Sequence, residues 1–197
     1  YKQLEKTMLL PFSDGDVDAA TAAILTNKLL QLAGGAVYDE NGKVQFVHDQ
    51  KLEVLDQLIE EANGQPVLVF YNYKHELDRL QARYPQAVHV KEENVVKRWN
   101  AKEIPILLAN PASAGHGLNL QFGGHIAIWY SPTWNLEFFQ QANKRLHRRG
   151  QAETVLIHTL SAKGTIDERI YDIVLRNKEA GQNALLEAVK ARIKEVT

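Results

Sequence analysis

The stretch Val67-Leu68-Val69-Phe70-Tyr71 is a short, unbroken run of apolar residues. A strand covered by helices on both faces has this pattern, whereas a strand with one face in water alternates apolar and polar residues. Two more covered strands are predicted at 106–109 and 125–130, further strands at 87–90 and 154–160, and helices at 74–84, 92–100 and 135–149. Repeated strand–helix–strand units with short connections predict an α/β fold with a mostly parallel sheet and helices on both faces.

The segments on either side of this alternation are predicted to be mainly helical. A helix from Asp16 to about Leu32 precedes Glu40-Asn41-Gly42-Lys43, and Asn-Gly between apolar runs is typical of a hairpin. A second helix spans residues 48–62, and helix resumes from Thr165 onward. The expected division is therefore an N-terminal helix-and-hairpin extension (1–50), a core (51–164) and a C-terminal helical brace (165–197).

Composition narrows the function classes. The 197 residues carry a net charge of −1, so nucleic-acid binding would need a local basic patch rather than a global field. Cysteine is absent from the sequence, which excludes disulfides and thiolate catalysis. No apolar run approaches the roughly 18 residues of a membrane span. The start, Tyr1-Lys2-Gln3, has neither an initiator Met nor the pattern of a signal peptide, so we expect a cytoplasmic protein from which this chain is a fragment.

The stretch 141–151, Gln-Ala-Asn-Lys-Arg-Leu-His-Arg-Arg-Gly-Gln, carries a dense group of cations. On a helix, Gln141, Arg145 and Arg148 share one face, because they stand at i, i+4 and i+7. Two guanidiniums and an amide form a donor array that suits phosphate oxygens. A solvated helix end that complements the helix dipole is the alternative interpretation. The phosphate interpretation is favoured because the helix follows a covered strand, and ligands of parallel sheets gather at the strands' carboxyl ends.

A glycine-containing segment, Asn110 to Leu120, follows another covered strand. Its small residues and two glycines, Gly115 and Gly117, permit close backbone approach to a ligand. Such a segment alone is weak evidence, because many glycine-rich turns have no ligand.

Together, these two segments resemble motifs V and VI of superfamily 2 helicases. The pattern Gln-x-x-x-Arg-x-x-Arg-x-Gly-Gln, preceded by Gly-x-Gly-Leu-Asn-Leu and by Trp134-Asn135, resembles the Swi/Snf group in particular. Residues 67–73 are similar to the motif IV region, and the segments 111–117 and 129–134 are similar to those of phage and prophage members. The resemblance implies the C-terminal RecA-like lobe of an ATP-dependent DNA translocase or helicase, with a three-layer fold.

The resemblance also implies roles for individual residues. Arg145 and Arg148 would be the catalytic arginines that reach the γ-phosphate of ATP, with Arg148 as the arginine finger. Gln141, Gly115 and Gly117 would belong to the nucleotide side of the site. Candidate contacts to a DNA backbone are Asn72, Asn110 and Ser113. The chain departs from the family pattern at Asn110-Pro111, Lys144 and Ser131, which concerns the DNA contacts more than the arginines.

The sequence lacks the groups that hold ATP itself. It contains no Gly-x-x-x-x-Gly-Lys-Ser/Thr loop, and no Asp-Glu pair ends a covered strand to bind Mg²⁺. Asp167-Glu168 lies at a predicted helix start, where Thr165 and Glu168 form a capping box. The expected cofactor, ATP with Mg²⁺, would therefore be held mainly by an N-terminal RecA-like lobe of the same parent chain, and the isolated fragment is predicted to be inactive.

Two other functions are weighed against this one. An autonomous nucleic-acid-binding α/β module without ATPase activity would need a longer basic stripe than the sequence contains. A small-molecule enzyme with a doubly wound sheet would leave the paired arginines unexplained and lacks a Gly-x-Gly-x-x-Gly segment after its first strand. The seven histidines show no metal-ligand spacing, so no metal site is predicted.

Overall fold

The computed structural model describes residues 2–3, 6, 19–113, 117–175 and 189–195. Backbone contacts divide the chain into two compact units. The first, which we call the core unit, comprises Gln50–Thr133 and Glu137–Leu160. The second, the flanking unit, comprises Tyr1–Asp49, Trp134–Leu136 and Ser161–Thr197.

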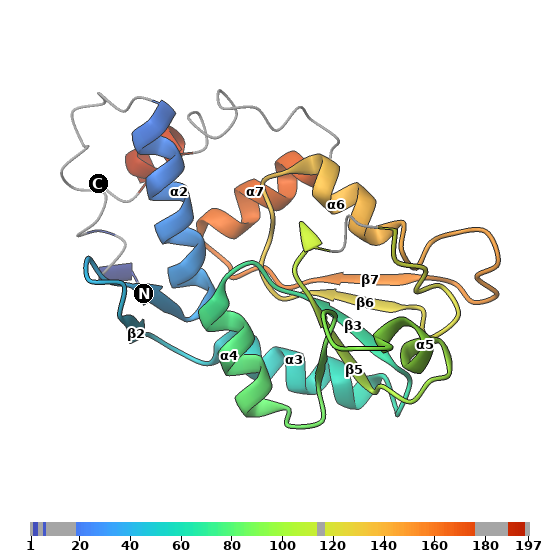
Figure 1. Ribbon diagram of the computed structural model, residues 1–197. Helices are drawn as coiled ribbons and strands as arrows, with labels where there is room; N and C mark the ends of the chain where they lie inside the picture. The colour runs from blue at the N-terminus through green and yellow to red at the C-terminus, as the bar shows by residue number, and fades with distance from the viewer. Residues whose placement is uncertain (1, 4–5, 7–18, 114–116, 176–188, 196–197) are drawn as a thin grey trace. The chain divides into compact units, whose positions relative to one another are not determined.

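A five-stranded sheet forms the centre of the core unit, in the order β4-β5-β3-β6-β7, with every neighbouring pair parallel (Figure 1). The strands are β3 (Val67–Phe70), β4 (Val88–His89), β5 (Ile106–Ala109), β6 (Ile126–Trp129) and β7 (Leu156–Thr159). Every residue of β3, β5 and β6 is buried, which is why these strands are continuous apolar runs in the sequence. The predicted α/β fold class with a parallel sheet is confirmed.

Helices cover both faces of this sheet. One face of β3 and β6 shares a continuous apolar cluster with α3 (Gln50–Glu61) and α4 (Lys74–Arg83). The other face carries Trp129, whose ring centroid lies 4.7 Å from that of Phe139 on α6 (Leu136–Asn143). The sheet therefore lies between two helical layers, as the alternation of strands and helices predicts.

Helix α5 (Val95–Asn100), between β4 and β5, is shorter than the predicted 92–100. Asn94 precedes it with a φ of 55° in the left-handed region, so helical backbone cannot run through that residue. At its other end, Trp99 is fully buried and its indole Nε1 donates to the carbonyl of Leu120 at 2.8 Å.

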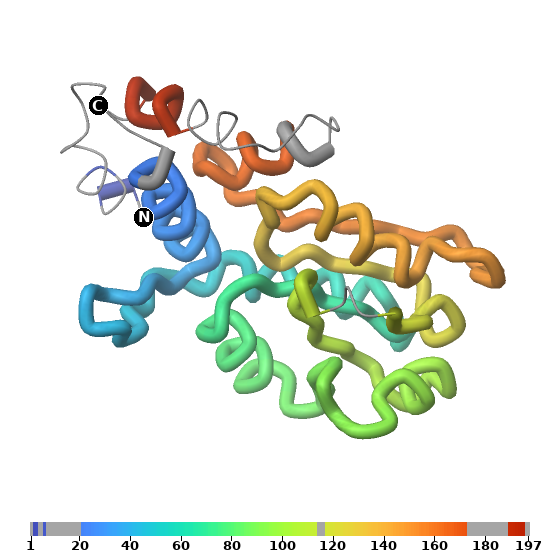
Figure 2. The backbone as a smooth tube through the Cα atoms, turned by 45° about the horizontal axis from the view of Figure 1, so that its top comes forward, coloured from blue at the N-terminus to red at the C-terminus, as the bar shows by residue number. Residues whose placement is uncertain are grey.

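The flanking unit contains α2 (Ala19–Gly34), a hairpin of β1 (Ala36–Tyr38) and β2 (Val44–Phe46), and α7 (Ile166–Leu175), with α2 packed against α7 (Figure 2). The hairpin predicted at Asn41-Gly42 is confirmed, and Gly42 has a φ of 75° that glycine adopts readily. The predicted start of α2, from Asp16 to Asp18, lies outside the described residues.

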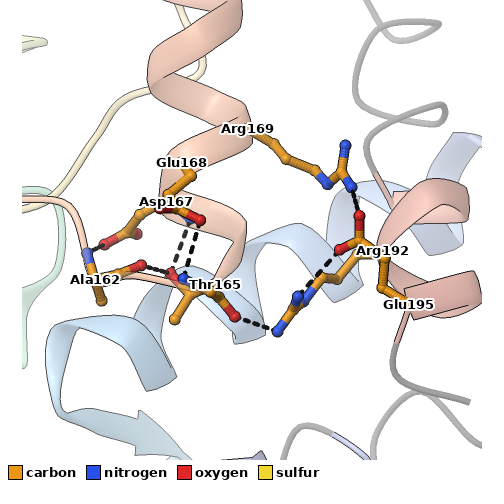
Figure 3. A network of polar contacts seen from close by, with 8 residues as sticks. Ala162, Thr165, Asp167, Glu168, Arg169, Arg192 and Glu195 are labelled. Atoms are coloured by element: carbon orange, nitrogen blue, oxygen red, sulfur yellow. Dashed lines mark hydrogen bonds and ion pairs between the residues drawn. The ribbon is translucent and has the colours of Figure 1, made fainter.

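A polar network surrounds the start of α7 (Figure 3). The Thr165 hydroxyl accepts a hydrogen bond from the Asp167 backbone N–H at 3.2 Å, and the Glu168 carboxylate accepts one from the Gly164 N–H at 2.9 Å. Thr165 and Glu168 thus cap the helix as predicted, although the glutamate bonds one residue further upstream than in the standard box. Arg192 donates to the Gly164 carbonyl, which ties residues 189–195 to this helix start.

Candidate functional site

The predicted site residues lie at two opposite edges of the core sheet. Asn72 and Asn110 follow β3 and β5 directly, so they lie at the carboxyl edge. The basic turn, residues 144–150, lies at the amino edge, because α6 starts beyond the end of β6 and returns to the start of β7 (Figure 1). The expectation that Arg145 and Arg148 gather at the carboxyl ends of the strands is therefore wrong; the returning helix carries them to the other edge.

The predicted helix over 135–149 is shorter than expected, since α6 ends at Asn143. The next backbone N–H groups still bond backward, but Arg145 and Leu146 reach only the carbonyls three residues before them. This tighter winding is common where a helix ends, and here it accompanies the full burial of Leu146. The three predicted residues therefore do not share the face of one uninterrupted helix.

Gln141, Arg145 and Arg148 nevertheless line one pocket, of about 500 Å³, whose other lining residues are Lys144, His147 and Arg149. The Gln141 amide donates to the Glu137 carboxylate at 2.7 Å, which holds the glutamine along α6. Burial, and then the charge of Arg148, lower the pKa of Arg145 from its usual value. A half-buried guanidinium beside another cation is favourably placed to receive an anion, because an anion offsets both effects.

Two residues without a predicted role fix the basic turn to the loop before β6, which we call the 117–124 loop. Arg148 Nη1 donates to the Asn119 side-chain oxygen at 2.5 Å. The Gln151 amide donates to the carbonyls of Gln121 and Gly124, at 2.8 and 2.9 Å. Gln151 is the last residue of one motif quoted above and Asn119 the second-last of the other, and this position is the signal in the sequence that could have identified them.

The same loop packs closely on the end of α5. A Cβ atom on Gly123 would lie 2.3 Å from the Trp99 carbonyl oxygen, and one on Gly124 would lie 2.8 Å from that of Pro66. Glycine is therefore required at both positions for the backbone to approach Trp99. Gly117 has a φ of 64°, and no atom lies within 4 Å of the place that a Cβ would take. Glycine is therefore favoured at this position by the backbone conformation and not by a lack of space. Gly115, the other predicted glycine, lies outside the described residues.

At the carboxyl edge, Asn72 and Asn110 connect the loops that follow three strands. The Asn110 amide donates to the carbonyls of Tyr71 and Asn72, at 3.3 and 3.1 Å. The Asn72 amide donates to the Ser131 hydroxyl at 3.1 Å and to the Pro132 carbonyl at 2.8 Å. Both asparagines are half-buried, as is Ser113, the third predicted DNA contact. The amide donors of the two asparagines thus already have acceptors within the protein.

Glu76, which is not among the predicted site residues, organises this edge. Its fully buried carboxylate accepts hydrogen bonds from the Asn72 and Tyr73 backbone N–H groups and from the Ser131 hydroxyl, at 2.9, 3.2 and 2.9 Å. Burial raises the pKa of Glu76, while these donors and the charge of Lys51 oppose that rise. The carboxylate therefore joins the loop after β3 to the loop after β6.

Among the described residues, no three or more His, Cys, Asp or Glu side chains converge to hold a metal ion. Of the helices in the same part of the chain, none combines the length and hydropathy needed to traverse a bilayer.

The core unit is a parallel three-layer domain with an arginine-lined pocket at one edge of its sheet. Comparison with known proteins identifies the family to which such a domain belongs. The model of the helicase conserved C-terminal domain matches residues 50–150, just over half of the chain. Protein p41 of Acyrthosiphon pisum secondary endosymbiont phage 1 is 40% identical over 98% of this chain and 43% of its own length. The chromatin-remodeling ATPase INO80 of Mycosarcoma maydis is 31% identical over 77% of this chain and 9% of its own length.

A solved structure supports the same fold. The C-terminal part of the Fun30 ATPase domain superposes with a TM-score of 0.60 at 21% identity, covering 74% of this chain and 52% of that one. The chain therefore belongs to the helicase conserved C-terminal domain family, as a RecA-like C-terminal lobe of the Swi/Snf type within superfamily 2. It spans less than half the length of either relative named above.

Proposed function

We propose that this chain is the C-terminal lobe of an ATP-dependent DNA translocase, and that it supplies Arg145 and Arg148 to ATP held with Mg²⁺ on an N-terminal lobe of the same parent chain. One observation carries the proposal: Gln141, Arg145 and Arg148 line one pocket at the edge of the core sheet. The pocket offers guanidinium and amide donors, which match phosphate oxygens. The lobe alone lacks a phosphate-binding loop, so it supplies part of an ATP site.

DNA is the proposed second ligand, at the carboxyl edge of the sheet. Asn72 follows β3 at this edge, and Asn110 and Ser113 follow β5. Because the amide donors of the two asparagines bond within the protein, we assign them to shaping the loops, with backbone N–H groups and Ser113 as the groups closest to a phosphate. Gly115 and Gly117 would lie between this edge and the arginine pocket along the chain.

The arginine assignment is tested in the protein that joins this chain to its N-terminal lobe. Arg148→Ala is expected to lower DNA-stimulated ATP turnover by about 10³-fold, since an arginine finger stabilises charge that develops in the transition state. Nucleotide binding, measured with a fluorescent ATP analogue, should change much less. Arg149→Ala is the matched comparison, because it removes the same charge from the same pocket. Equal losses in both variants, or unchanged turnover in Arg148→Ala, would contradict the assignment.

A further inference from the structure

Arg148 has an exposed side chain, yet its position is defined by the protein. A free arginine side chain on a surface samples many rotamers, and ordering it for a reaction costs conformational entropy. Here the Nη1 group donates to Asn119 Oδ1 at 2.5 Å, and the bond spans 29 residues of sequence. A guanidinium has five N–H donors, so this contact leaves most of them available to a phosphate.

Asn119 is itself held firmly, although its side chain is exposed. Its backbone carbonyl accepts a hydrogen bond from the Asn100 amide at 2.9 Å. The next carbonyl along the chain, that of Leu120, accepts one from the buried Trp99 indole at 2.8 Å. Both donors lie at the end of α5, so this end of the helix fixes the backbone from which the Asn119 side chain projects.

The backbone of the basic turn is fixed against the same loop. The Gln151 N–H bonds to the Arg148 carbonyl at 3.0 Å, and the Gln151 amide bonds to Gln121 and Gly124. The two ends of the Asn119–Arg148 bond are therefore held at a set distance by contacts that do not involve either side chain. The Asn119 side-chain oxygen, held by this backbone, restricts the orientation of the Arg148 guanidinium before any ligand binds. The arginine is therefore preorganised.

We propose that Asn119 is a positioning residue: its side-chain oxygen aims the Arg148 guanidinium at the γ-phosphate, so that the loop leading into β6 sets the arginine finger. This inference rests on the proposed function of Arg148.

The contact is tested first in this chain, by NMR of the arginine side chains. Restricted rotation of the Arg148 guanidinium is expected in the wild type and in Asn119→Asp, which keeps an acceptor oxygen, and is expected to be lost in Asn119→Ala. Asn41→Ala, at the exposed hairpin turn of the flanking unit, should leave the signal unchanged. An Arg148 signal that is the same in the wild type and Asn119→Ala would overturn the proposal.

Its consequence is tested in the protein that contains both lobes. Asn119→Ala is expected to lower kcat about tenfold, the effect of one hydrogen bond to a charged group, with the KM for ATP within about twofold. Asn119→Asp should recover most of the loss, because its carboxylate keeps an acceptor oxygen for the guanidinium and an exposed ion pair is too weak to withdraw Arg148 from phosphate. A change in KM alone, or equal losses in the Ala and Asp variants, would overturn the positioning role.

The outcomes separate this inference from the function on which it rests. If Arg148→Ala retains full turnover, the arginine-finger assignment fails whatever the NMR signal shows. If Arg148→Ala abolishes turnover and Asn119→Ala leaves kcat unchanged, the finger assignment stands and the role of Asn119 fails.

Discussion

At the scale of single residues, His75 makes the stability of the core unit depend on pH. The ring is 2% exposed and stacks on Tyr73 with an interplanar angle of 7°. Burial, followed by the positive charge of Arg79, lowers the pKa of His75 to about 4, against the negative charge of Asp78. Between pH 6.5 and 4 the unfolded chain binds a proton that the folded chain excludes, so acidification favours unfolding. We expect this residue alone to remove about 2 kcal/mol of stability between pH 7.5 and pH 5.

The measurement is chemical denaturation at both pH values, on the wild type and on His75→Phe. Phenylalanine can stack on Tyr73 but cannot take up a proton. Glu76 acts in the opposite direction, because its raised pKa gives stability at low pH that is lost as pH rises through the folded pKa. Since both proteins carry Glu76, the difference between their pH profiles isolates the histidine. Parallel profiles would show that His75 is not the buried neutral base described here.

At the scale of elements, the contact between the 117–124 loop and α5 predicts a strong effect of one methyl group. In Gly123→Ala the new Cβ would lie 2.3 Å from the Trp99 carbonyl oxygen and 2.4 Å from the ring, so backbone must shift. We expect a loss of about 3 kcal/mol in the free energy of unfolding, the upper end of the range for overpacking, because the new atom meets backbone. Gly64→Ala is the control: it meets no atom within 4 Å and carries only the strain of its φ of 79°, about 1 kcal/mol. Urea denaturation of both variants should rank them in this order; a smaller loss in Gly123→Ala than in Gly64→Ala would contradict the packing described.

The elements also show where sequence reasoning succeeds. Strands β3, β5 and β6 were predictable because burial on both faces leaves a continuous apolar run. The end of α6 was not, because helical spacing continues through Arg148 in the sequence while the backbone tightens after Asn143. The residues that line the arginine pocket were predictable from their spacing in the sequence. The edge of the sheet at which the pocket lies was not predictable, because it depends on the path of α6. Likewise, nothing in the sequence pairs Arg148 with Asn119, since that contact depends on how two loops pack.

At the scale of the whole molecule, the proposed division of an ATP site between two lobes predicts what this chain does alone. Its arginines line a pocket, but its sequence contains no phosphate-binding loop of the kind that positions the β- and γ-phosphates and Mg²⁺ for attack by water. We expect phosphate release by the isolated chain to match the protein-free rate, with or without DNA. Adding the N-terminal lobe, in trans or by a linker, should restore DNA-stimulated turnover, and Arg148→Ala should remove it again.

Circular dichroism of the isolated chain must show a folded α/β domain, so that inactivity reports a missing half-site rather than unfolding. Turnover by the isolated chain that Arg148→Ala abolishes would mean that this lobe holds the nucleotide itself, and the two-lobe assignment would have to be given up.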